Sequence, residues 1–143
     1  MPSFAHTETV AASPEHVFAI IDDFTRTPEW LTRCTGIDKL EDGPNHAGLP
    51  LKYHYKDGSR TGTMDGEVAA REQDRHLTLH FVDKMTDVTV DFKVAPMGAE
   101  TSLTHEITIQ TKGFGKLFTP MIKRALPRQT LDAMTKLKAL AES

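Results

Sequence analysis

The sequence has almost no cysteine, no long apolar run and no marked excess of charge. Its one cysteine, Cys34, excludes an internal disulfide, so the fold does not depend on oxidation. No stretch approaches the ~18 apolar residues of a membrane span, and the first residues lack the basic start and apolar run of a signal peptide. We therefore expect a cytoplasmic protein without stable membrane insertion.

The balance of charge narrows the choice of partners. Seventeen basic side chains stand against 20 acidic ones, for a formal net charge of -3. This charge lacks the strong basic field that nucleic-acid binding needs, so we expect no nucleic-acid partner. The 143 residues are 38% hydrophobic and 26% charged, which predicts one globular domain over residues 1–143.

Helix-start signals follow an expected first strand at residues 4–12. Ser13 is a good N-cap before Pro14, and the apolar stripe after it predicts a helix that ends near Asp23. A second start follows at once, with Thr27 as the cap. It predicts a short helix that stops at Gly36.

Apolar and polar residues alternate from residue 37 to residue 110. Each of the six runs in this region has one apolar and one polar face, which is typical of an antiparallel sheet covered on one side. The tail is the candidate cover, because its apolar residues recur at helical spacing from about Lys116. Pro127 should kink this helix near Lys123, and we expect residues 117–126 to bound the enclosed space.

Several segments stand in a recognisable order and spacing. They are residues 10–18, Asp23, Pro28 to Trp30, Leu117 to Pro120 and Leu131 to Glu142. With the order of the expected elements, they resemble the START/Bet v 1-like (SRPBCC) superfamily, and especially its bacterial polyketide cyclase/dehydrase-type proteins. The resemblance implies an α+β helix-grip fold, in which a seven-stranded curved antiparallel sheet holds a long C-terminal helix over a cavity. Relatives in this superfamily bind lipids, sterols, polyketides or plant hormones, and some are cyclases, aromatases or dehydratases.

The inward face of such a sheet and the first half of the helix would line the cavity. Phenols at this face can bind a carbonyl or hydroxyl of a ligand by a hydrogen bond. The candidate ligand-binding residues are Trp30, Tyr53, Tyr55, Met64, Leu79, Phe81, Val90, Phe92, His105, Ile107, Phe118, Met121, Ile122 and Ala125.

His105 points inward by alternation, and a histidine in a cavity can act as a general acid or base. In this fold the first strand neighbours the last, so Glu8 or His6 could approach His105. Such a pair would be a proton-transfer unit. The alternatives are a structural histidine in the core and a partly solvated first strand. His105 and Glu8 are therefore candidates only, and no catalytic residue is assigned.

The sequence lacks metal-ligand spacings, a phosphate-binding loop and a nucleophile elbow, so we expect no metal and no cofactor. The start of the long helix is basic at Lys116, Lys123, Arg124 and Arg128. These residues either attract an acidic ligand or lipid headgroup, or form a solvated helix face.

Three functions remain open for a chain that we expect to be a monomer or homodimer. The first is the binding or carriage of a small hydrophobic or amphipathic ligand: a lipid, polyketide or aromatic compound. The second is an enzyme of cyclase, aromatase or dehydratase type, with His105 and Glu8 or a tyrosine as proton-transfer groups. The third is a protein-interaction module of co-chaperone type.

Overall fold

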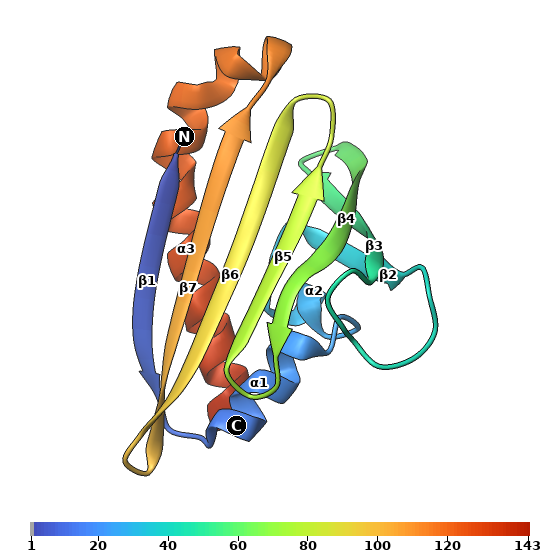
Figure 1. Ribbon diagram of the computed structural model, residues 1–143. Helices are drawn as coiled ribbons and strands as arrows, with labels where there is room; N and C mark the ends of the chain where they lie inside the picture. Colours follow the sequence, from blue (N-terminus) through green and yellow to red (C-terminus); the bar gives the residue numbers. More distant parts are fainter. Residues whose placement is uncertain (1) are drawn as a thin grey trace.

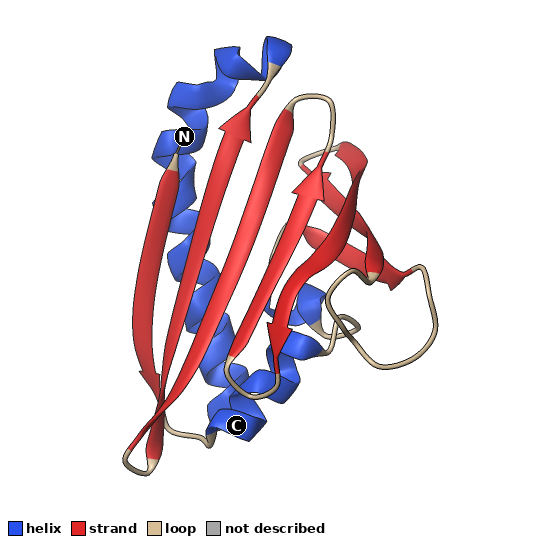
Figure 2. Cartoon of the chain, in the orientation of Figure 1, coloured by secondary structure: helices blue, strands red, loops and turns tan. Residues whose placement is uncertain are grey.

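A computed structural model describes residues 2–143, and in it a curved sheet lies against one long helix and two short ones (Figures 1 and 2). This arrangement confirms the predicted α+β helix-grip fold. The elements are β1 (Ser3–Val10), α1 (Pro14–Asp22), α2 (Thr27–Trp30), β2 (Cys34–Lys39), β3 (Pro50–Asp57), β4 (Arg60–Glu72), β5 (His76–Val82), β6 (Thr86–Met97), β7 (Glu100–Thr111), η1 (Gly113–Phe118) and α3 (Thr119–Glu142).

The sheet has seven strands in the order β1-β7-β6-β5-β4-β3-β2, and each pair of neighbours is antiparallel. The first strand thus pairs with the last, with Thr7 opposite Thr104. Strand β4 carries a register shift between Val68 and Ala70. At Gly66 a Cβ atom would lie 2.3 Å from the ring of Phe81, so only glycine lets this ring lie across the strand.

Helix α1 begins as its sequence predicts. The hydroxyl oxygen of Ser13 accepts a hydrogen bond from the backbone N–H of His16 at 3.2 Å, which satisfies one of the free donors of the first turn. The helix ends at Asp22, and its apolar stripe is buried. The buried residues of α1 are Val17, Phe18, Ile20 and Ile21.

Helix α2 is shorter than the prediction and starts differently. Thr27 is its first helical residue rather than its cap, and the helix ends at Trp30. The prediction that it continues to Gly36 is wrong, because Cys34 and Gly36 lie in β2 and pair with Tyr55 and His54 of β3. A single helical turn is marginal by itself, and the ladder of hydrogen bonds with β3 outweighs its extension.

Helix α3 lies along β1 and β7, behind them in Figure 1. It begins after the 3₁₀ turns of η1 and runs without a break through Pro127 to Glu142. The backbone N–H of Ala11 donates to the carboxylate of Glu142 at 2.8 Å, which joins the end of β1 to the end of α3. The buried residues of α3 all lie in its later part: Leu126, Thr130, Ala133, Met134, Leu137 and Ala141.

Candidate functional site

A small cavity lies between the concave face of the sheet and the two short helices. Its volume is about 40 Å³, and its wall is almost wholly apolar. Side chains from α1, α2, β2, β3, β5, β6 and β7 form this wall. They are Ile21, Thr27, Trp30, Leu31, Ile37, Tyr53, Leu79, Phe81, Val90, Phe92, His105 and Ile107.

The structure places eight of the predicted ligand-binding residues on the cavity wall. These are Trp30, Tyr53, Leu79, Phe81, Val90, Phe92, His105 and Ile107. The other six lie off it: Tyr55, Met64, Phe118, Met121, Ile122 and Ala125.

The prediction that residues 117–126 bound this cavity is wrong, because α3 lies along the β1–β7 edge and these residues are not part of the cavity wall. Phe118 is 43% exposed and Met121 62% exposed. Sequence reasoning also missed four wall residues. The helical stripe of α1 could have indicated Ile21, and alternation along β2 could have indicated Ile37. The shared side of the predicted second helix could have indicated Leu31, next to Trp30. No comparable pattern indicates Thr27.

His105 lies on β7 and is 1% exposed. Its ring stacks on Phe92 with the centroids 4.4 Å apart, and the edge of Trp30 lies 6.5 Å away. Burial lowers the pKa of His105 to about 4, so the imidazole is neutral at pH 7. Its Nδ1 atom is buried without a hydrogen-bond partner in the described part of the chain.

Trp30 gives the cavity a second unpaired nitrogen. The residue is 3% exposed, and its indole Nε1 has no hydrogen-bond partner among residues 2–143. A buried donor or acceptor left unpaired costs about 1–3 kcal/mol, so two such atoms on residues of one cavity wall are a costly arrangement.

Tyr53 and Cys34 are neutral groups beside this site. Burial raises the pKa of the Tyr53 phenol, which lies 4.9 Å from Phe81 between ring centroids. Burial likewise raises the pKa of the Cys34 thiol to about 11. At neutral pH the phenol can therefore donate a hydrogen bond, whereas the thiol is not a thiolate nucleophile.

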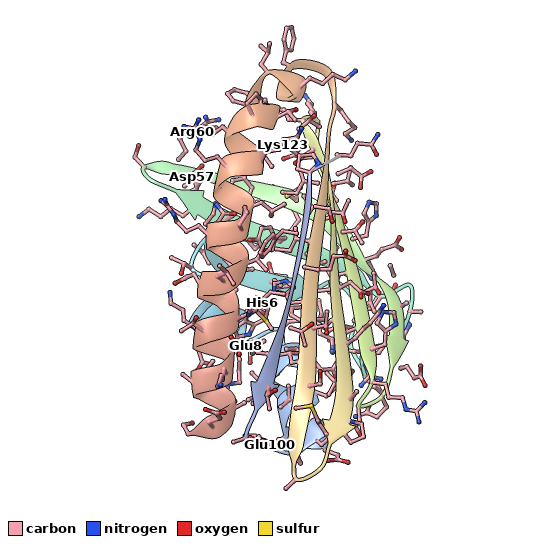
Figure 3. All side chains as sticks on the ribbon, turned by 90° about the vertical axis from the view of Figure 1, so that its left-hand side faces the viewer. His6, Glu8, Asp57, Arg60, Glu100 and Lys123 are labelled. Atoms are coloured by element: carbon pink, nitrogen blue, oxygen red, sulfur yellow. The ribbon has the colours of Figure 1, made fainter. Side chains whose placement is uncertain are left out.

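Glu8 does not join His105. One carboxylate oxygen of Glu8 lies 3.1 Å from Nε2 of His6, and the other lies 3.9 Å from Nζ of Lys138 on α3. Figure 3 shows His6 and Glu8 together on β1, beside the helix. His6 stands opposite His105 in the sheet register, but its hydrogen bond goes to Glu8. The predicted Glu8–His105 pair is wrong, because His6 lies two residues away on the same face of β1.

Three other histidines pair with carboxylates on the outer side of the sheet. His76 lies 2.6 Å from Asp91, His54 lies 2.8 Å from Asp38, and His80 contacts Asp87. Within residues 2–143 no three His, Cys, Asp or Glu side chains gather closely enough to hold a metal ion.

A larger, open hollow of about 530 Å³ lies outside the cavity, at the end of α1 and beside β2. Ile37 lines both spaces and therefore separates them. In the wall of the hollow Asp22 accepts two hydrogen bonds from Arg71, at 2.9 and 2.8 Å, and two from Asn45. The hydrogen bond to Asp22 raises the pKa of Arg71, and the network fixes the loop before β3.

Residues 1–142 match the sequence model of the family described as "Polyketide cyclase / dehydrase and lipid transport". The chain belongs to this family. Comparison with curated protein sequences gives no match. Within residues 2–143, none of the helices combines the length and hydropathy needed to cross a bilayer.

Several solved structures share the fold of this polyketide cyclase/dehydrase family member. A START superfamily protein from Mycobacterium smegmatis is 20% identical, with a TM-score of 0.78 over 98% of this chain and 97% of that one. The Zhui aromatase/cyclase from Streptomyces sp. R1128 is 15% identical, with a TM-score of 0.77 over 98% and 93%. The di-domain ARO/CYC StfQ of the steffimycin biosynthetic pathway is 14% identical, with a TM-score of 0.79 over 99% of this chain and 50% of that one. At these identities the likeness shows the fold.

Proposed function

We propose that this member of the family binds a small, mostly apolar molecule that carries one hydrogen-bonding group, in the cavity beneath the sheet. The observation that carries the proposal is that His105 and Trp30 line one apolar cavity and that Nδ1 of His105 and Nε1 of Trp30 are buried without a hydrogen-bond partner among residues 2–143. An indole N–H donates a hydrogen bond, and a neutral imidazole nitrogen either donates or accepts. A hydroxyl or carbonyl oxygen of the ligand would satisfy the nitrogen that it reaches.

The present volume limits the size of the ligand. A cavity of about 40 Å³ is much smaller than the ~150 Å³ that accommodates benzene, so an aromatic ligand requires the wall to move. Ile37 is the wall residue that also lines the open hollow. We infer that the ligand enters there, by displacement of Ile37.

The same geometry favours binding over proton transfer. Among residues 2–143, His105 lies against two aromatic rings and forms no ion pair with a carboxylate, and its pKa of about 4 is far below neutral pH. A group of that pKa is a weak base at pH 7. Tyr53 lies on the wall as a neutral phenol, so it serves as a further hydrogen-bond donor for the ligand. The cytoplasmic location and the monomeric or homodimeric state remain predictions.

The chain carries its own reporter for a binding test, because Trp30 is its one tryptophan. Its indole N–H gives a single indole resonance in a ¹H–¹⁵N spectrum. The shift of this resonance can be followed while phenol, benzene, 2-naphthol or naphthalene is added to the protein. We expect each hydroxylated compound to bind about fivefold more tightly than its hydrocarbon, the factor that a hydrogen bond of ~1 kcal/mol supplies. The preference should disappear in His105→Leu.

His80→Asn is the matched control, because His80 lies on the outer side of the sheet, where it contacts Asp87. It should bind all four compounds as the wild type does. No shift of the indole resonance with any compound would contradict ligand binding in this cavity. Equal affinity for the hydroxylated and hydrocarbon members would contradict the role given to His105 and Trp30.

A further inference from the structure

Five of the eight exposed large apolar side chains among residues 2–143 lie at the end of the molecule where β7 leads into α3. Phe114 is 83% exposed, Leu117 77%, Met121 62%, Phe118 43% and Met85 36%. We call these five residues the apolar end patch. Isolated apolar side chains are normal on a surface, whereas a contiguous group marks a site of interaction.

The backbone holds the apolar end patch together. The carbonyl oxygen of Met85, in the β5–β6 turn, accepts a hydrogen bond of 2.8 Å from the backbone N–H of Lys112. A Cβ atom at Gly115 would lie 2.2 Å from that same oxygen, so the glycine permits a close contact between η1 and the turn. The hydroxyls of Thr111 and Thr119 lie 2.8 Å apart and link the two ends of η1. Figure 1 shows η1 and this turn at the same end of the molecule.

The charged residues of the segment that contains most of the patch are all basic. Residues 107–131 contain five basic side chains and no Asp or Glu, although the whole chain has a net charge of -3. Among the described residues, no ion pair involves any of the five, and Figure 3 shows Lys123 on α3 near this end. They are Lys112, Lys116, Lys123, Arg124 and Arg128.

The nearest acidic residues of the β5–β6 turn already have partners. The carboxylate of Asp83 accepts hydrogen bonds from the backbone N–H groups of Met85 and Thr86, at 2.8 and 2.7 Å. Asp87 contacts His80. Among residues 2–143, no ion pair joins either carboxylate to the five basic residues.

We propose that the apolar end patch docks on the surface of an anionic lipid bilayer. Phe114, Leu117 and Met121 would enter the headgroup layer, while the surrounding lysines and arginines contact lipid phosphates. Exposed apolar residues combined with unpaired cations are the composition that binds such a surface without spanning it. A second copy of the chain is a poorer occupant, because an isologous contact would bring two basic surfaces together. This proposal is independent of the ligand in the cavity.

Vesicle flotation tests the docking. The wild type should float with phosphatidylcholine vesicles that contain about 30% phosphatidylglycerol, and much less with phosphatidylcholine alone. We expect the double variant Phe114→Ser/Leu117→Ser to lose about tenfold or more in partition, because two apolar anchors are removed. Lys116→Gln/Lys123→Gln should weaken binding severalfold, as should salt at about 0.5 M.

Matched control variants remove exposed groups elsewhere on the surface. Leu40 is 57% exposed and Met97 is 45% exposed, so Leu40→Ser/Met97→Ser removes two apolar side chains away from the patch. Lys93→Gln on β6 removes a positive charge from an exposed position outside residues 107–131. Both controls should bind vesicles as the wild type does, and circular dichroism should show the same fold in every variant.

A second measurement locates the contact directly. In Phe114→Trp the new indole should shift its emission to the blue when anionic vesicles are added, whereas in Met97→Trp it should not. Absence of wild-type binding, or unchanged binding by Phe114→Ser/Leu117→Ser, would overturn the proposal. So would equal binding to neutral vesicles. Dimerisation that the double variant abolishes, without vesicle binding, would overturn it in favour of a second copy of the chain.

Discussion

The two halves of the C-terminal segment differ in what surrounds them. From Leu126 onward every third or fourth residue of α3 is buried against the body of the protein. Before Leu126 four large apolar residues are exposed, among them Leu117 at 77%, and Ile122 is half-buried. Both halves have an apolar pattern at helical spacing, so the pattern alone does not show which half is part of the core.

This contrast distinguishes residues that stabilise the fold from residues that are available to bind a partner. A buried side chain is constrained by its neighbours, and its loss leaves a space. An exposed apolar side chain contributes little to folding and exposes an unfavourable surface, which calls for a partner. The buried half therefore stabilises the fold, and the exposed half is available for interactions with a partner.

Truncation of a leucine in each half should give the largest difference. Leu137 is 0% exposed, so Leu137→Ala should lower the free energy of unfolding by about 3–4 kcal/mol. Leu117→Ala should change it by less than about 0.5 kcal/mol. Urea unfolding followed by circular dichroism measures both values. Equal effects in the two variants would show that the exposed half packs in solution.

Acid should destabilise the interior through His105. The pKa of this group is about 4 in the fold, below the usual value of about 6.5 in an unfolded chain. Between these values the unfolded state binds more protons, so stability falls as the pH is lowered, by up to about 3 kcal/mol near pH 4. Above about pH 6.5 the contribution is complete and constant.

Unfolding curves between pH 7.5 and about pH 4 check this prediction. In His105→Leu the part of the acid dependence that belongs to the imidazole should vanish. Leu117→Ala, in the exposed half, should keep the wild-type profile. An unaltered profile in His105→Leu would show that His105 is protonated equally easily in the folded and unfolded chains.

The ion pair between Arg71 and Asp22 should contribute more than its exposed counterparts. Their side chains are 18% and 19% exposed, and Arg71 makes two hydrogen bonds to the carboxylate. Asp22→Ala should cost about 2 kcal/mol, because it leaves a largely buried guanidinium unpaired.

The pair Arg75–Glu72 provides the control for that experiment. Its side chains are 74% and 61% exposed. Glu72→Ala should therefore cost less than about 0.5 kcal/mol in the same thermal or urea measurement. Comparable losses in the two variants would contradict the importance given to burial.

Pro127 stands at the boundary between the two halves, and its replacement should have the smallest effect. Proline has no N–H, so the carbonyl of Lys123 lacks its helical hydrogen bond. Pro127→Ala should restore that bond and raise the free energy of unfolding by about 1 kcal/mol. A loss of stability, measured by thermal unfolding, would show that packing of the proline ring outweighs the missing bond.

Local patterns predicted much of the fold. Ser13 indicated the start of α1, and alternation indicated the strands between residues 37 and 110. The predicted length of α2 was wrong, because Cys34 pairs with Tyr55, which lies on a later strand. Long-range pairing of this kind leaves no local signal.

The candidate site was predicted in part for a related reason. Alternation places His105 and Phe92 inside, and the structure confirms that they are buried. The volume of the cavity depends on how twelve wall residues pack together, which no periodicity encodes. The partner of Glu8 was nearer than expected, since His6 lies two positions away on the same face of β1.

The pairing of β1 with β7 also has a consequence for the time course of folding. Thr7 and Thr104 contact each other across 97 positions of sequence. At ~5–20 residues per second, roughly 5 to 20 s of synthesis separate β1 from its partner strand. Throughout that interval β1 has an open edge, so the last step of sheet formation must follow the synthesis of β7. We expect this step to limit the folding rate, and chaperones that bind unpaired strands to act on the chain before it occurs.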